Sequence, residues 1–236
     1  MERGREEAVM VDAITKPADD IRSFGTIKVR TSGELVPVTE VELGQGDSIF
    51  FEHHILLWKD PTVSITAKVM KGVGKRMLAG LPIYVTEAHG PGRIGFSRDA
   101  PGQVIFIEVK QGMQIHVREH QFLFSTSGIN YSFFRVKGIS NLLYGGTGMF
   151  IDVFDGSGLL AIHGYGNIFT RNLASGEAID VEPGGFLYKD ASVKMETHSL
   201  GLKTGLFGGM TLMINRFSGP GVIGIQSMPF HLQTGE

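Results

Sequence analysis

Short apolar runs, separated by glycine-rich turns, extend along most of this chain. The runs hold four to eight residues, often alternate with polar positions, and are rich in Ile, Val, Phe and Thr between residues 24 and 228. Such alternation puts successive side chains on opposite faces of a strand, whereas a helix repeats its apolar positions every three or four residues. The pattern predicts an all-β protein with little helix.

The glycines reveal an internal repeat. The sequence "GPGRIGF" from Gly90 recurs as "GSGLLAI" from Gly156 and as "GPGVIGI" from Gly219. One constant offset maps Gly90 onto Gly156 and also Gly46 onto Gly112, and residues of similar character lie between them. A fixed offset over such a span predicts a duplicated unit. A third copy follows with different connection lengths, which surface loops tolerate.

The repeat predicts a single all-β domain over residues 24–228. Its expected parts are leading strands 24–39, repeats at about 40–103, 104–175 and 176–228, an N-terminal extension 1–23 and a C-terminal tail 229–236. Three similar units sharing a core predict a pseudo-threefold arrangement, as in a β-prism or a barrel. With 42% hydrophobic and 19% charged residues, the chain can bury a sizeable core.

The stretch "GPGRIG" matches the G-x-G-x-x-G spacing of dinucleotide-binding turns. Such a site needs a helix after the glycines, whose N-terminal amides receive the pyrophosphate. Here an apolar, alternating strand pattern follows, so the sequence predicts a structural turn in each repeat, of the hairpin kind, in which glycine supplies a positive φ. The predicted turn residues are Gly90, Gly92, Gly156, Gly158, Gly219 and Gly221.

Charge and composition exclude several classes of protein. A net charge of -2 with dispersed Lys and Arg provides no basic field for a phosphate backbone, so no nucleic-acid partner is expected. The absence of cysteine excludes disulfides and thiolate metal sites. No apolar run reaches the length of a transmembrane segment, and the N-terminus lacks the apolar core of a signal peptide. We expect a cytoplasmic protein, for which peripheral membrane contact is still open.

Histidines are the candidate metal ligands. On a strand, His116, Arg118 and His120 would share one face, and a cation between two ligands disfavours a metal. His54 and His120 are equivalent in the repeat, but the matching position of the third copy is near Ser192, so no threefold cluster forms. Three well-placed ligands are needed for a metal site. The sequence therefore predicts surface or partly buried histidines, and neither a metal nor another cofactor.

No nucleophile motif is present, and carboxylates such as Asp152, Asp155 and Asp180 fall at turns or on strand faces where solvated charge is normal. The sequence thus predicts no catalytic residues. The favoured hypothesis is a non-enzymatic scaffold or interaction module, because an enzyme needs a convergent, asymmetric site. The alternative is a small-ligand-binding or metal-dependent enzyme with a β-barrel-like pocket, in which His54, His116 or His120 takes part.

Each repeat carries an apolar, glycine-bearing segment, "RMLAGLP", "LLYGGTG" and "GLFGGMT". These segments either close a shared core around the pseudo-threefold axis or form an exposed patch for a partner protein, a lipid surface or a second subunit. Unpaired outer strands give a second reason to expect a homo-oligomer, with a trimer as the first hypothesis. The candidate patch residues are Met77, Leu78, Leu143, Tyr144, Leu206 and Phe207.

The combined pattern resembles a known family. The three-copy repeat, the lead-in "ELGQGDSIFFE", the turn "GPGRIGFS" and the C-terminal "GPGVIGIQSM" are similar to the altered-inheritance-of-mitochondria type 24 family, grouped with proteins like the tryptophan RNA-binding attenuation protein. The resemblance covers about residues 24–228 and implies antiparallel sheets with internal pseudo-symmetry. It links eukaryotic members to mitochondrial inner-membrane organisation and supplies no catalytic residues. Lacking an Arg-rich transit peptide, the chain resembles a prokaryotic, cytoplasmic member.

Overall fold

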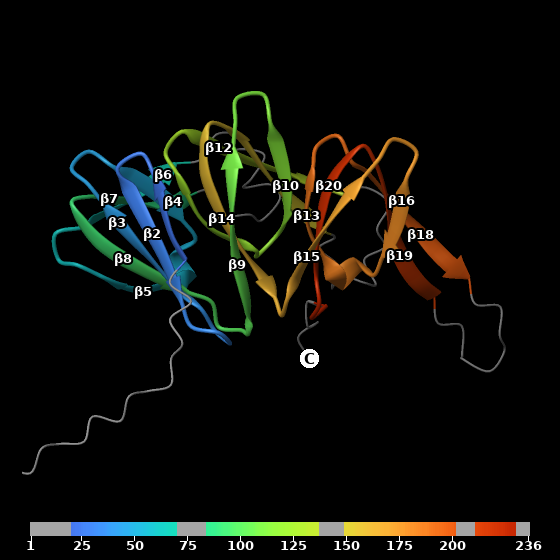
Figure 1. Ribbon diagram of the computed structural model, residues 1–236, viewed down its shortest axis with the longest axis horizontal. Helices are drawn as coiled ribbons and strands as arrows, with labels where there is room; N and C mark the ends of the chain where they lie inside the picture. The colour runs from blue at the N-terminus through green and yellow to red at the C-terminus, as the bar shows by residue number, and fades with distance from the viewer. Residues whose placement is uncertain (1–19, 70–83, 137–148, 202–210, 230–236) are drawn as a thin grey trace, which may run out of the picture.

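The computed structural model describes residues 20–69, 84–136, 149–201 and 211–229. These residues form antiparallel strands and two single 3-10 turns, without an α-helix in the described ranges. The strands follow one another along the long axis of the molecule from the N-terminal to the C-terminal end (Figure 1). The prediction of an all-β protein with little helix is confirmed.

The elements are β1 (Asp20–Phe24), β2 (Ile27–Ser32), β3 (Val38–Leu43), β4 (Ser48–Phe51), η1 (His53–Ile55), β5 (Leu56–Lys59), β6 (Ser64–Val69), β7 (Tyr84–His89), β8 (Gly92–Ser97), β9 (Gly102–Val109), β10 (Gln114–Arg118), β11 (Phe122–Thr126), β12 (Ile129–Arg135), β13 (Phe150–Gly156), β14 (Gly158–Tyr165), β15 (Ile168–Leu173), β16 (Ala178–Val181), η2 (Pro183–Gly185), β17 (Phe186–Asp190), β18 (Lys194–Gly201), β19 (Thr211–Ser218) and β20 (Gly221–Gln226).

Six consecutive strands pair in one pattern, and this pattern occurs three times. In the set β3 to β8, the first and third strands both pair with the sixth, and the second and fourth both pair with the fifth. The set β9 to β14 pairs in the same way. So does the set β15 to β20, which begins at Ile168 rather than near residue 176. We call these the first, second and third sets.

Neighbouring sets are joined by one further pairing, which we call a junction. The second strand of one set pairs with the third strand of the next, so that β4 pairs with β11 and β10 pairs with β17. Each junction completes a six-stranded sheet. In the described part of the chain, β5 and β16 have no such partner and lie at edges of a five-stranded and a three-stranded sheet. A closed pseudo-threefold arrangement would need this third junction and stays a prediction.

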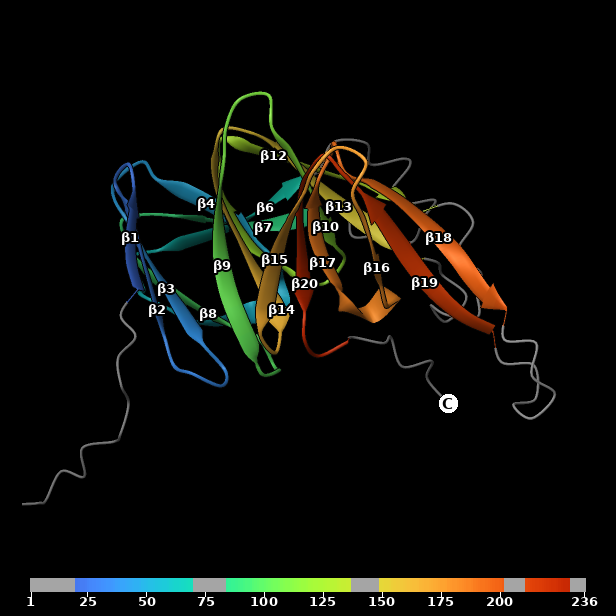
Figure 2. The ribbon, with the colours of Figure 1, turned by 45° about the vertical axis from the view of Figure 1, so that its right-hand side comes forward.

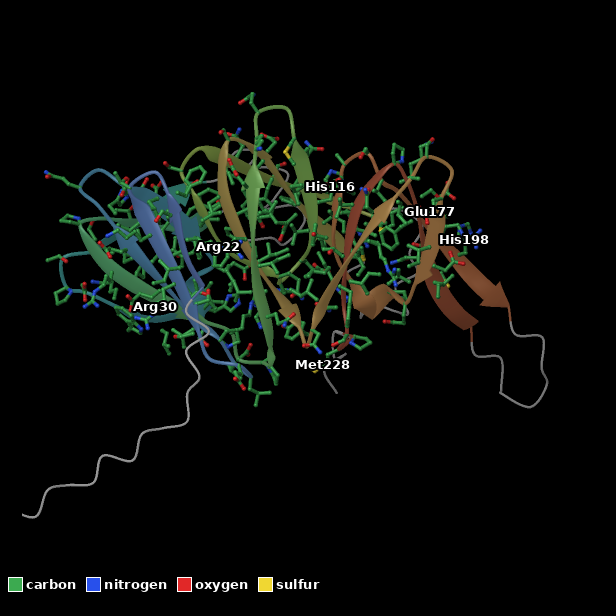
Figure 3. All side chains as sticks on the ribbon, in the orientation of Figure 1. Arg22, Arg30, His116, Glu177, His198 and Met228 are labelled. Atoms are coloured by element: carbon green, nitrogen blue, oxygen red, sulfur yellow. The ribbon has the colours of Figure 1, made fainter. Side chains whose placement is uncertain are left out.

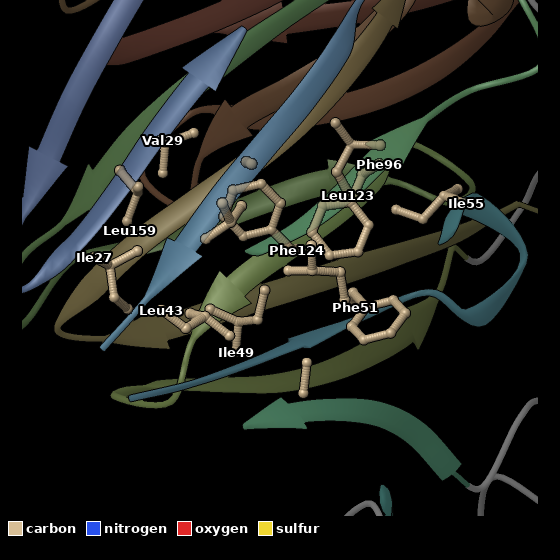
Figure 4. Close-up of a cluster of buried hydrophobic side chains, with 14 of the residues drawn as sticks. Ile27, Val29, Leu43, Ile49, Phe51, Ile55, Phe96, Leu123, Phe124 and Leu159 are labelled. Atoms are coloured by element: carbon tan, nitrogen blue, oxygen red, sulfur yellow. The ribbon is translucent and has the colours of Figure 1, made fainter. Parts of the chain in front are cut away.

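Each set has its own hydrophobic core, and the junctions share side chains between cores. In the first core, Phe51 and Phe96 pack with Leu123 and Phe124 of the second set (Figure 4). The second core likewise includes Leu187 and Tyr188 of the third set. The third core, which contains Val181, Phe186 and Phe217, has no contribution from the third strand of another set among the described residues. Burying each such side chain stabilises the fold by about 1.5–3 kcal/mol.

The glycine turns connect different sheets and are not hairpins. Strand β7 pairs with β4 and β6, whereas β8, which follows the turn at Gly90, pairs with β3 and β5. The turns at Gly156 and Gly219 make the same crossing between sheets. The prediction of hairpins was therefore wrong, although each turn does lie between two strands.

The leading segment forms a β-hairpin that extends the first set. Strand β2 pairs with β1 and β3, and the three strands lie side by side at the N-terminal end (Figure 2). Alternate residues of β2 are buried, so that Ile27 and Val29 enter the first core. Strand β1 begins at Asp20, inside the expected N-terminal extension.

Candidate functional site

The predicted turn glycines are required for two different physical reasons. Gly92, Gly156 and Gly221 have φ values of 137°, 108° and 136°, a region in which side chains with a Cβ are strained. At the other three glycines, neighbouring atoms leave no space for a Cβ. A Cβ at Gly90 would meet the Gly44 carbonyl oxygen, one at Gly158 the Thr126 hydroxyl, and one at Gly219 the backbone of Leu173 and Ala174. None of these six glycines contributes a polar side chain to a functional site.

The three sets share a distinctive contact between their third and sixth strands. Trp58 of β5 faces Gly95, and Tyr188 of β17 faces Gly224. A Cβ at Gly95 would come within 2.5 Å of Trp58 Cε2, so the ring packs directly on the glycine backbone. Each contact follows a β-bulge, and Phe124 faces Ala161 at the corresponding place in the second set. These pairs fix the alignment of the three sets residue by residue.

With this alignment, an exposed apolar surface stands out on β5. Leu57 corresponds to Leu123 and Leu187, which lie beside the same bulge in the other sets. Leu57 is 57% exposed, whereas Leu123 and Leu187 are 1% and 0% exposed. The difference arises because β11 and β17 have a neighbouring strand from another set, whereas β5 has none among the described residues. Leu56 is also exposed, at 36%, although its counterparts Phe122 and Phe186 are fully buried.

The predicted interaction patch lies elsewhere in the sequence. Its members, Met77, Leu78, Leu143, Tyr144, Leu206 and Phe207, fall outside the described residues. Sequence reasoning missed the surface on β5, because "ILLWK" resembles the equivalent segments "QFLFS" and "GFLYK", both of which are buried.

Two buried arginines fasten the junctions. Arg98 donates through Nη2 to Glu52 Oε2 at 3.1 Å and to the Phe122 carbonyl at 3.0 Å, which ties the first set to the second. Arg118 donates to the Pro183 carbonyl at 3.0 Å, which ties the second set to the third. Both guanidinium groups are buried, and a buried charge is tolerated only when it is paired and hydrogen-bonded. These polar groups therefore serve the architecture of the junctions.

The candidate histidines have separate environments. His54 Nε2 lies 3.1 Å from Arg98 Nη1, while His116 on β10 is hydrogen-bonded to Gln114 Oε1 at 3.0 Å. Burial, with a contribution from Lys189, lowers the pKa of His116 to about 4. His120 occupies a turn with φ of 66°, and burial followed by the charges of Arg98 and Arg118 lowers its pKa. All three groups are therefore neutral or already engaged in structural contacts.

The aligned strands correct one equivalence. Position 184, a glycine in η2, corresponds to His54 and His120, because Phe186, Leu56 and Phe122 precede the same bulge. The expected counterpart, Ser192, lies after β17 instead. The third copy has connections of different length, so counting from distant glycines misplaced this position.

The carboxylates also differ from expectation in one case. Asp152 is buried and accepts a hydrogen bond from the Tyr131 hydroxyl at 2.7 Å, so the prediction of a solvated group was wrong there. Asp155 accepts from Asn130 Nδ2 at 3.0 Å, in an exposed pair. Asp180 is exposed and accepts two hydrogen bonds of 2.7 Å from Arg216.

The sequence matches the model of a known protein family. Residues 29–228 match the family model described as mitochondrial biogenesis AIM24. The chain belongs to the AIM24 family. The fold resembles the crystal structure of protein SPYM3_0169 from Streptococcus pyogenes, with a TM-score of 0.67 and 20% sequence identity, over 86% of this chain and 94% of that chain. No curated protein matches the sequence.

The described residues contain neither a cluster of metal-binding side chains nor a helix that could span a membrane. In the parts of this AIM24-family chain that the structure describes, no group of three or more His, Asp or Glu side chains could hold a metal ion. His116 and His198, for example, lie well apart along the long axis (Figure 3). Within the same ranges, no helix has the length and apolar character to cross a membrane.

The burial of His163 should make the free energy of unfolding depend on pH. Burial, with Arg98 as the second cause, lowers the pKa of His163 from 6.5 to about 4, and the side chain is 1% exposed. Between these values the unfolded chain binds a proton that the folded chain excludes. The free energy of unfolding therefore rises with pH from 4 to 6.5, by about 3 kcal/mol from this residue.

Substitution of His163 by Phe should remove this contribution. Urea titrations of both proteins at pH 4 and pH 7 should show a smaller rise in the free energy of unfolding for the variant. Comparing the rise, and not the absolute stability, separates titration from altered packing. Equal rises in the two proteins would contradict the assignment.

Proposed function

We propose that this AIM24-family chain is a non-enzymatic scaffold that assembles with copies of itself. The observation that carries the proposal is the exposure of Leu57, at a position that is buried by a neighbouring strand in both other sets. An unpaired edge strand with exposed apolar side chains is a template for association with another chain. The structural role of the buried arginines is consistent with a protein whose polar interior serves its architecture.

The alternative hypothesis, an enzyme with a β-barrel-like pocket, has less support. His54 and His116 are hydrogen-bonded to neighbouring side chains, and the side chains of His54, His116 and His120 come from different strands and turns. Catalysis requires groups that converge on a position where a reacting atom can lie. An assembly role requires only a surface that a second chain can cover.

The order and location of the assembly are further parts of the proposal. A trimer remains the first hypothesis for the order, and other proteins remain candidate partners alongside a second copy. The sequence favours a cytoplasmic location without nucleic-acid binding, whereas the family description refers to mitochondrial biogenesis. A role in organising membranes through peripheral contact would fit the eukaryotic relatives. Cell fractionation tests the location directly.

Sedimentation velocity at micromolar protein concentration tests the assembly. We expect a species whose mass is a multiple of the 25.7 kDa chain, with a population that falls on dilution. The apolar edge drives association, so moderate salt should change the distribution little. A single species at the mass of one chain across the micromolar range would contradict the proposal.

A further inference from the structure

Resting on the proposed assembly, a more specific inference concerns how two copies meet. We propose that β5 of one copy pairs antiparallel with β16 of a second copy, which forms the junction that is missing from the described part of a single chain. The two strands are the third strand of the first set and the second strand of the third set, the same two kinds of strand that form the internal junctions. The joined edges would make one continuous sheet.

The internal junctions define the register of this pairing. In both junctions, the aromatic residue of the third strand pairs with the same aligned position of the second strand. The residue after the aromatic one then pairs with the residue that precedes this position in the second strand. The observed pairs are Phe124 with Phe51 and Ser125 with Phe50 in one junction, and Tyr188 with Val117 and Lys189 with His116 in the other. The same register places Trp58 opposite Val181 and Lys59 opposite Asp180 of the second copy.

Charge complementarity supports this register. Lys59 and Asp180 are both exposed in the single chain, and the Lys59 ammonium group, which donates to the Val63 carbonyl at 2.9 Å, has further N–H groups to donate. Directly opposed residues of an antiparallel pair project from the same face with Cα atoms about 4.5–5.5 Å apart, so the ammonium group can reach the carboxylate. Asp180 would then lie between Arg216, which already donates to it, and Lys59. Opposite charges at this position distinguish the correct register from a shifted one.

The third core supports the same partner. Leu123 and Phe124 enter the first core across one junction, and Leu187 and Tyr188 enter the second core across the other. The third core has no such pair among the residues described. Leu57 and Trp58 of a second copy occupy the corresponding place beside β16. Their apolar surface would be removed from water, which is the driving force for association.

The arrangement of the chain favours a second copy over closure within one chain. Strand β5 lies towards one end of the long axis and β16 towards the other (Figure 1), whereas paired strands are about 4.8 Å apart. Each contact joins two different surfaces, so successive copies form a ring when the rotation between them closes. In a closed ring of two, three or more copies, every β5 and every β16 is paired.

Engineered cysteines test the contact, because the native chain has none. We expect Lys59→Cys and Asp180→Cys, mixed and mildly oxidised, to form a disulfide-linked product of two chains, since the expected Cα separation suits a disulfide. The matched control mixes Lys59→Cys with Lys194→Cys, an exposed position on β18 outside the junction. Linkage in the first mixture and not in the control supports the inference.

Charge reversal gives a second, non-covalent test. Lys59→Glu alone should weaken association at least tenfold in sedimentation, and the double variant Lys59→Glu/Asp180→Lys, which has opposite charges at every contact of a ring of any size, should restore assembly. Native circular dichroism of each variant verifies its fold. Wild-type assembly of Lys59→Glu together with absent cross-linking would overturn the pairing, while the scaffold proposal would stand. Monomeric wild-type protein would overturn both.

Discussion

Replacing Gly92 or Gly221 with Val should lower the free energy of unfolding by about 2–6 kcal/mol. Both glycines have a positive φ, of 137° and 136°, where a β-branched residue costs about 1–3 kcal/mol. The added Cβ would also lie 2.5 Å from Thr62 Oγ1 at Gly92, and 2.6 Å from Ser192 Oγ at Gly221. Overpacking of this kind adds about 1–3 kcal/mol.

Equilibrium denaturation in urea measures this loss, and another glycine provides a matched control. Gly46 has a φ of 87°, but a Cβ there would have no atom within 4 Å. Gly46→Val makes the same chemical change, so it should carry the conformational cost alone and lose less stability than the valine variants at Gly92 and Gly221. A Gly92→Val protein as stable as Gly46→Val would show that space at the turn does not limit the side chain.

The turns also show what local sequence can predict. Gly-Pro-Gly and Gly-Ser-Gly indicate tight connections between strands, because few other residues adopt the backbone conformations that such connections need. Which strand pairs with which depends on contacts between residues far apart in sequence. The residues around Gly90 are compatible with a hairpin, yet β7 and β8 enter different sheets. The strands and turn positions could be predicted, but the pairing could not.

The open junction was beyond sequence reasoning for a related reason. The strands β5, β11 and β17 have similar sequences, so their local pattern predicts equal burial. Their actual burial depends on whether another set of strands precedes them, as it does for β11 and β17 but not for β5. A repeat has two ends, and only the assembled topology shows which strands those ends leave unpaired. The role of the buried arginines at the junctions could not be predicted either, since nothing in the sequence around Arg98 or Arg118 indicates which carbonyl each would contact.

Leucines at equivalent positions give the second large effect. Leu123→Ala should lower the free energy of unfolding by about 2–5 kcal/mol, because Leu123 is 1% exposed in the first core and its truncation leaves a cavity. Leu57→Ala makes the same chemical change at the corresponding position of β5, where the side chain is 57% exposed. In an isolated chain the second change should cost no more than about 0.5 kcal/mol, as for other surface substitutions.

Protein concentration separates the two leucines further. The cost of Leu123→Ala belongs to the folded chain itself and should be the same in dilute and concentrated samples. The cost of Leu57→Ala should grow with protein concentration, because association stabilises the folded state by an amount that rises with the logarithm of the protein concentration above the dissociation constant. Denaturation curves recorded at nanomolar and at high micromolar concentrations measure both. If the Leu57→Ala cost stayed small and constant, Leu57 would remain exposed to water at all concentrations, and β5 would not be the strand that a second copy covers.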